Sequence, residues 1–351
     1  MVRRRFGGLR FMAVAGLVVF AAACGDDPTG PGSTDPFDVE QANQDFGVVQ
    51  AAFDANLDLV EDMGLVLPVL EGIGPTARRF ERVEIPSEPS ILSMARTTRL
   101  SVGSGASVQP ILPSDVLGKT FEWSDVEGAY VVSERPGAPA NGLRVIVYDR
   151  TATPFVEVGF VEVTDESDAA ADRLRVRLEK EGVTRLDYTV EATQSTSSAA
   201  VMVDGFITDG VEQVNFHVFE SATETQSGAT LEVGYNLAME GRPLSVSFTT
   251  VLNIGETLTA SLSATFVNGS NALSLDMSQD ETGAVDGTVT WNGEIVMTVT
   301  GTGESEPVFL GPEGEALTPA EAQAIAEMFE LVQEGLFFLA ANLAFLGAGL
   351  T

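Results

Sequence analysis

Few residues in this 351-residue chain could do covalent or metal chemistry. The chain has one histidine, His217, and one cysteine, Cys24, and its only lysines are Lys119 and Lys180. One histidine cannot build a multi-histidine metal site, and one cysteine cannot build a thiolate zinc site. The sequence also has no Gly-x-Ser-x-Gly elbow, no Ser-x-x-Lys pair and no phosphate-binding glycine loop. We therefore expect no catalytic residues, no cofactor and no metal site, and a chain that is not an enzyme.

Carboxylates are abundant, and two acidic clusters fall between predicted strands. Asp165-Glu166-Ser167-Asp168 and Asp280-Glu281 could supply calcium ligands, but neither has the spacing of an EF-hand loop. Solvated turns are the expected role, with calcium binding as the lesser alternative. A glycosidase needs only two carboxylates about 5 to 10 Å apart, so the sequence leaves that chemistry open. The predicted polar strand faces are poor in the aromatic residues that sugar clefts use.

The first residues of the chain are typical of an export signal. Arg3, Arg4, Arg5 and Arg10 precede an apolar run over residues 11–23. A membrane-spanning helix needs about 20 apolar residues, so this run predicts a removed signal peptide over residues 1–23.

The end of that run, Ala21-Ala22-Ala23-Cys24, resembles the lipobox of bacterial lipoproteins. The resemblance covers residues 1–24 and departs from the commonest pattern in having Ala21 where leucine is usual. It implies that Cys24 is lipidated and that lipid holds the chain in the cell envelope. The alternative is an ordinary cleavable signal with Cys24 inside the mature chain, but a lone thiol without a disulfide partner favours lipidation. Gly25 and Asp26 follow the cysteine, an order that favours the outer over the inner membrane.

The charge of the mature chain narrows its partners. After Cys24 the chain has 15 basic and 51 acidic residues, a net charge near −36. Nucleic acid and anionic headgroups are therefore poor partners. The hydrophobic share of 44% is typical of a folded protein, and the few tyrosines and tryptophans argue against a transmembrane barrel.

The chain before residue 119 divides into a tether and a helical region. Residues 24–36 contain Gly, Asp, Pro, Thr and Ser after the cysteine and predict a flexible tether. Residues 37–118 begin with apolar residues at helical spacing, from Val39 and Phe46 to Val60, which predict an amphipathic helix ending near Gly64. The rest of this region predicts a loop that contains prolines and several arginines.

Residues 119–304 have the strongest pattern, an alternation of apolar and polar residues. Leu174, Val176 and Leu178 alternate with Arg173, Arg175, Arg177 and Glu179, which predicts a strand buried on one face. His217 faces away from Val214, Phe216 and Val218, and we expect it to be exposed with no special role. Five dipeptides predict tight hairpins: Asp204-Gly205, Asp209-Gly210, Asn268-Gly269, Asp286-Gly287 and Asn292-Gly293. About a dozen strands in an antiparallel meander follow from this pattern.

A second helix is predicted over residues 318–347. Thr318-Pro319-Ala320-Glu321 is a capping-box start, and apolar residues then recur at steps of four and three from Ile325 to Leu346. Past Gly335 the helix is apolar on nearly every side and must be surrounded. A membrane span is the rival interpretation, but the run is short for one, so we prefer a core helix.

The predicted fold is α+β, mainly β: one domain over residues 37–351, in which a large curved antiparallel meander, half-barrel or barrel-like, packs on an N-terminal and a C-terminal helix. This architecture resembles the half-barrel lipoprotein carriers and receptors of the bacterial envelope, which hold acyl chains. Two functions follow. The first is a structural or interaction lipoprotein with an envelope protein as partner, and the second is carriage of a hydrophobic ligand in the concavity. The apolar C-terminal helix favours the first, and an envelope hydrolase is a distant third.

Overall fold

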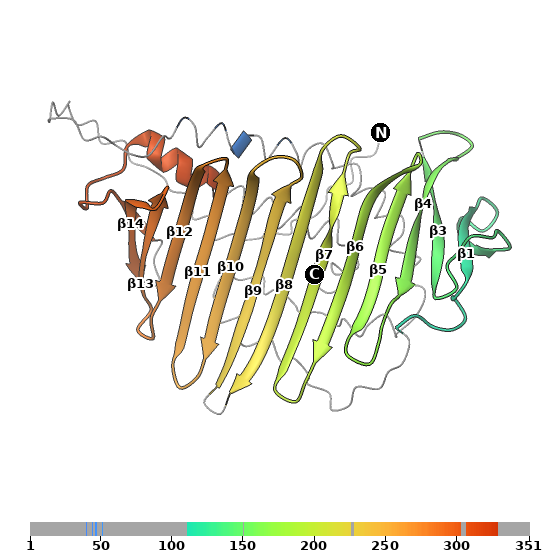
Figure 1. Cartoon of the computed structure of the whole chain (residues 1–351), viewed down its shortest axis with the longest axis horizontal. Helices are drawn as coiled ribbons and strands as arrows, with labels where there is room; N and C mark the ends of the chain where they lie inside the picture. Colours follow the sequence, from blue (N-terminus) through green and yellow to red (C-terminus); the bar gives the residue numbers. More distant parts are fainter. Residues whose placement is uncertain are drawn as a thin grey trace.

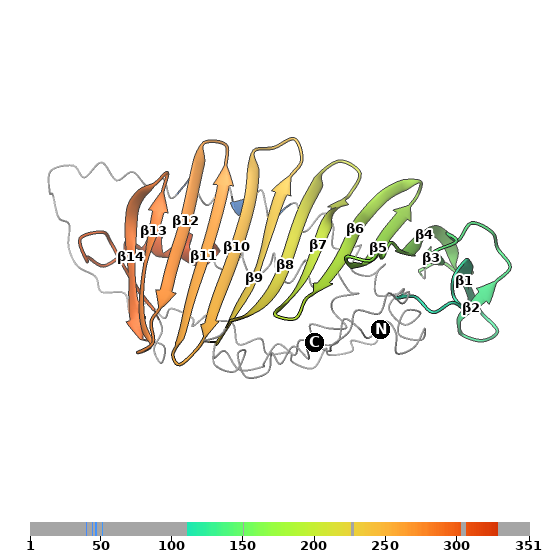
Figure 2. The same cartoon turned by 60° about the horizontal axis from the view of Figure 1, so that its bottom comes forward.

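The computed structural model describes residues 40, 44, 46, 47, 51, 111–149, 151–225, 228–302 and 307–328. Most of these residues belong to one sheet of fifteen strands (Figures 1 and 2). The strands are β1 (Lys119–Ser124), β2 (Ala129–Ser133), β3 (Gly142–Asp149), β4 (Val156–Asp165), β5 (Asp172–Lys180), β6 (Val183–Gln194), β7 (Ser198–Thr208), β8 (Gln213–Thr225), β9 (Gly228–Met239), β10 (Leu244–Ile254), β11 (Leu258–Asn268), β12 (Asn271–Gln279), β13 (Ala284–Trp291), β14 (Glu294–Thr302) and β15 (Val308–Leu310).

The sheet is a meander in which nearly every strand pairs with its neighbours in sequence. From β3 to β15 each strand pairs antiparallel with the next, and β1 joins the other end by a short parallel pairing with β3. The mainly β prediction and the meander are confirmed. The sheet is half-barrel-like but open, because β2 and β15 lie at opposite ends of the strand order, so the barrel-like alternative is wrong. It also has more strands than the predicted dozen and continues through β15, past residue 304.

The alternation of side chains gives the sheet two different faces. We call inner the face that carries Leu174, Val176 and Leu178, all of which are 0% exposed. Equivalent positions on the other long strands join the same core, among them Tyr188 and Leu275. We call outer the opposite face, which carries the charged, hydroxyl and amide side chains that alternate with this core.

Two of the five predicted turn dipeptides lie inside strands instead. Asp204-Gly205 is in β7 and Asp286-Gly287 is in β13. Gly205 stands between Tyr188 and Phe216 on the neighbouring strands, and a side chain there would overlap the backbone and Cβ of Tyr188. These glycines therefore serve close packing. The other three dipeptides do form turns, as in Asn292-Gly293, where both residues have positive φ.

The predicted C-terminal helix begins where its sequence indicates. Residues 319–328 are helical, and Thr318 and Glu321 form the capping box. The Thr318 amide donates to the Glu321 carboxylate at 2.7 Å, and the Glu321 amide donates to the Thr318 hydroxyl at 3.3 Å. Ala324, Ile325 and Met328 belong to the core, so the start of this helix packs with the inner face.

The remaining predictions about the helices concern residues that lie mostly outside those that the structure describes. The few described residues between 40 and 51 are helical, and the Phe46 ring contacts Phe266 of β11 with centroids 4.8 Å apart. The rest of the N-terminal helix, residues 329–347 of the C-terminal helix, the signal peptide and Cys24 lie outside the described residues. A pair of full helices packed on the sheet therefore stays a prediction.

Candidate functional site

A row of charged side chains crosses the outer face over β3 to β7. The strand register places Arg144, Glu162, Arg177, Asp187 and Phe206 directly opposite one another in that order. Opposite residues on neighbouring strands have Cβ atoms about 5 Å apart, so their side chains interact. The row therefore alternates basic and acidic groups and ends at an aromatic ring.

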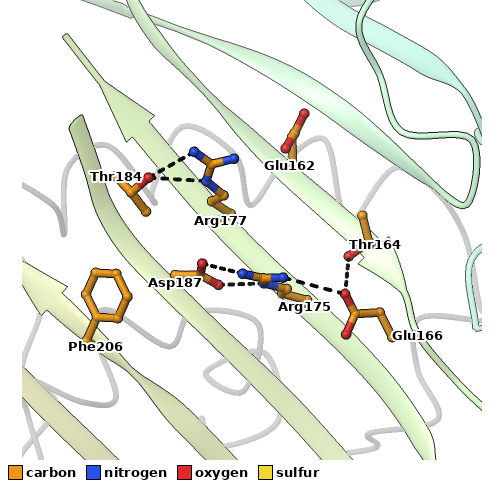
Figure 3. A pocket seen from close by; sticks show the side chains of 8 residues that line it. All are labelled: Glu162, Thr164, Glu166, Arg175, Arg177, Thr184, Asp187 and Phe206. Carbon is orange, nitrogen blue, oxygen red and sulfur yellow. Dashed lines mark hydrogen bonds and ion pairs between the residues drawn. The ribbon is translucent and has the colours of Figure 1, made fainter. Parts of the chain in front are cut away.

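Arg175 lies beside this row and is held by two carboxylates. Its guanidinium donates to both oxygens of Asp187, each at 2.7 Å, and lies 4.0 Å from Glu166 (Figure 3). The hydrogen bonds to Asp187 raise the pKa of Arg175 above its ordinary value. Bidentate pairing fixes the plane of the guanidinium, so Arg175 is a rigid part of the surface.

The two arginines within the row, Arg144 and Arg177, are held differently. Arg177 donates to Glu179 at 2.9 Å and to the Thr184 hydroxyl at 3.0 and 3.2 Å. Arg144 donates to Glu162 at 2.5 and 3.1 Å, and its guanidinium lies 4.1 Å from the centroid of the Phe160 ring. These groups are oriented by their neighbours and need no ligand for stability.

A shallow depression of about 350 Å³ opens among these side chains (Figure 3). Its lining consists of Glu162, Thr164, Glu166, Arg175, Arg177, Thr184, Asp187 and Phe206. Three carboxylates and two guanidiniums nearly balance in charge, and the threonines and Phe206 add hydroxyl groups and one apolar surface. The depression offers many fixed hydrogen-bond donors and acceptors around a single ring.

His217 lies on the outer face, as the alternation of β8 predicts. Its Nδ1 is 2.6 Å from Asp204 Oδ1, and its ring lies beside Phe219 with centroids 5.6 Å apart. In the strand register Ser247 is two strands away from His217, a separation of about 10 Å. Ser247 is therefore too far from the His217–Asp204 pair to complete a Ser-His-Asp triad.

The carboxylates of the acidic turns accept hydrogen bonds from the protein's own backbone and side chains. Asp165 accepts from the amides of Ile111 and Ser167 at 2.7 and 3.0 Å. The amides of Ala170 and Ala171, together with Arg173, lower the pKa of Asp168. Asp280 accepts from the hydroxyl and amide of Thr282, and the hydroxyl contributes most to lowering its pKa. Within the described part of the chain, no three His, Cys, Asp or Glu side chains gather to hold a metal ion.

Two polar groups on the inner face lack partners among the described residues. The Tyr188 hydroxyl is fully buried and has no hydrogen bond there. Glu220 lies in the register between Val201 and Val233, and burial raises the pKa of its carboxyl. Glu220 and its neighbours Val201 and Val233 are half-buried, whereas Phe216, Leu237 and Val246, which form another row across the inner face, are buried.

The sequence identified the arginines of β5 as outward-facing but did not bring them together with Phe206. The turn predicted at Asp204-Gly205 concealed Phe206, because it interrupted the strand on which that ring lies. The signal that could have revealed it is the continuous alternation of Met202, Asp204 and Phe206 on one face of β7. Glu162 and Asp187 can be placed in the depression only when the strand register is known, and the sequence does not show that register.

Comparison with protein-family models, curated protein sequences and solved structures found no significant match to this chain. Among the residues that the structure describes, no helix combines the length and the hydropathy needed to cross a membrane.

Proposed function

We propose that this protein is a non-enzymatic cell-envelope lipoprotein, anchored by lipid on Cys24, that presents the outer face of its sheet to a partner in the envelope. Its inner face is the core that holds the sheet in shape. The lipobox-like sequence supports the anchor, and the high negative charge supports a role away from nucleic acid and anionic headgroups.

The observation that carries the structural role is the burial of the inner face. Leu143, Leu178, Leu186, Leu273 and Met297 are all 0% exposed, although they are spread from β3 to β14. A cavity wide enough for an acyl chain would leave its walls accessible to water. These positions have no such space beside them, which favours a filled core over a carrier.

The second candidate is carriage of a hydrophobic ligand, and one part of the inner face favours it. Val201 and Val233 are only half-buried and lie next to Glu220 in the strand register, and the half-buried Leu262 continues the same row beyond Thr250. An apolar chain could lie along this row.

Mass spectrometry of the protein purified without detergent separates the two functions. A filled core should carry no stoichiometric lipid apart from the anchor, and a carrier should retain one. Stoichiometric lipid on a Cys24→Ser variant, which cannot be acylated there, would overturn the structural role.

The anchor has its own test. Cys24→Ser should move the exported protein from the membrane fraction to the aqueous fraction, and labelled fatty acid should no longer be incorporated. Retention of label in the variant would refute lipidation at Cys24.

A further inference from the structure

We infer that the depression on the outer face of β4 to β7 binds a neutral saccharide. This rests on the proposed function, in which the outer face is the presented surface, and it names the chemistry of the partner. Three features of the depression lead to it: an aromatic ring at one end, a dense set of fixed polar groups, and a charge that nearly balances within a strongly acidic protein.

The dimensions suit a sugar. From Glu162 on β4 to Phe206 on β7 the row crosses three strand spacings, about 14 Å in all. The volume of about 350 Å³ lies at the lower end of the range for small-molecule sites. The depression can therefore hold a short oligosaccharide lying across the strands.

The side chains match the two kinds of surface that a sugar ring presents. The C–H face of a pyranose packs on the negatively polarised face of an aromatic ring, and the half-buried Phe206 offers such a ring. Neighbouring hydroxyl groups on a sugar pair with planar carboxylates and guanidiniums, which Glu162, Arg175 and Arg177 supply. Because Arg175 and Arg177 are already oriented by Asp187 and Thr184, little side-chain entropy is lost on binding.

The charges select a neutral ligand. Each arginine of the depression is paired with a carboxylate, so an anionic ligand would have to displace an existing ion pair. The formal net charge of −32 for the whole chain also repels anions approaching this face. A cation would have to displace a guanidinium from its carboxylate, since Arg175 and Arg177 already occupy Asp187 and Glu179. A saccharide without charge avoids all three costs.

The test uses saturation-transfer-difference NMR on the full chain with neutral trisaccharides, namely cellotriose, maltotriose and N-acetylchitotriose, and with trigalacturonate as the anionic counterpart. At least one neutral trisaccharide should receive saturation. Phe206→Ala should weaken its binding by about tenfold or more, which corresponds to losing one good contact.

Two variants serve as controls. Phe206→Tyr keeps the ring and should keep binding. Phe219→Ala removes the same side chain from the same face, about 13 Å further along the neighbouring strand and outside the depression, and should leave binding unchanged. Thermal unfolding of each variant shows that it is folded.

The inference is overturned if no neutral trisaccharide binds, if trigalacturonate alone binds, or if Phe206→Ala binds as tightly as the unmodified chain. None of these results bears on the lipid content of the purified protein. Failure here is therefore distinguishable from failure of the proposed function.

Discussion

Replacing Tyr188 with phenylalanine should make the protein more stable, although it removes a polar group from a well-packed core. Tyr188 is 1% exposed and faces Gly205 and Phe216 on the inner side of β6. No described residue gives its hydroxyl a hydrogen bond. In the unfolded chain water satisfies that hydroxyl, so folding carries a desolvation cost without a compensating interaction.

The expected gain follows from two opposing terms. Burying an unsatisfied hydroxyl costs about 1 to 3 kcal/mol, and Tyr188→Phe removes that cost. The void left by one oxygen atom costs only a few tenths of a kcal/mol at about 24 cal/mol per Å³. We therefore expect the free energy of unfolding to rise by about 1 kcal/mol.

Urea denaturation measures this change, with Tyr130→Phe as the matched control. The Tyr130 hydroxyl donates to the carbonyl oxygen of Ile146 at 2.8 Å, so the same substitution there should lower stability by about 1 kcal/mol. Burial also raises the pKa of Tyr188 in the folded state. The unfolded chain ionises first, so the wild type loses stability above about pH 10 and the advantage of Tyr188→Phe should widen there.

Two results would contradict this prediction: Tyr188→Phe is less stable than the wild type at neutral pH, or Tyr188→Phe and Tyr130→Phe shift the unfolding midpoint in the same direction. Lower stability of Tyr188→Phe would mean that the Tyr188 hydroxyl makes a stabilising interaction in solution, and a rise in both variants would mean that the gain does not come from the missing hydrogen bond.

Three further substitutions have expected outcomes that urea denaturation can check. Glu220→Gln should stabilise the protein by about 1 kcal/mol at neutral pH, since it replaces a partly buried carboxylate with an uncharged amide. Because the folded pKa is raised, the gain should vanish below the ordinary glutamate pKa of about 4.3 and grow above it; a gain independent of pH would contradict this. Gly205→Ala should cost about 2 kcal/mol or more, since a methyl group would overlap the Asp187 carbonyl oxygen, and an unchanged midpoint would show that the strands separate easily. Thr318→Ala should cost about 1 kcal/mol by removing the helix cap, and equal stability would mean that the cap contributes nothing.

The long strands could be predicted from the sequence because burial on one face imposes a period of two. Leu174, Val176 and Leu178 have that period, and all three are fully buried. The turns are harder to predict than the strands, because the dipeptide Asp-Gly occurs both in a hairpin turn and inside a strand. Gly205 is required by the close approach of the Asp187 carbonyl and of the backbone and Cβ of Tyr188, which belong to the neighbouring strand and cannot be seen in a local pattern.

The set of residues that line the depression depends on the strand register even more strongly than the turns do. Arg177, Asp187 and Phe206 belong to three different strands, and a shift of one residue in any pairing would send a side chain to the inner face. The sequence shows that each strand alternates but not which residues stand opposite one another. Only the paired sheet places the aromatic ring beside the ion pairs.

The short length of the two edge strands explains why the sheet does not close into a barrel. β8 has 13 residues, whereas the edge strands β2 and β15 have 5 and 3. Closing the barrel would require these short strands to pair along their length, and three residues cannot supply the hydrogen bonds of a full-length seam. Short edge strands also limit pairing with other chains, and the acidic net charge adds repulsion between copies. In the strand order β4 to β7 lie away from both edges, so pairing of another chain at an edge strand would leave the outer face of β4 to β7 exposed, as the proposed recognition there requires.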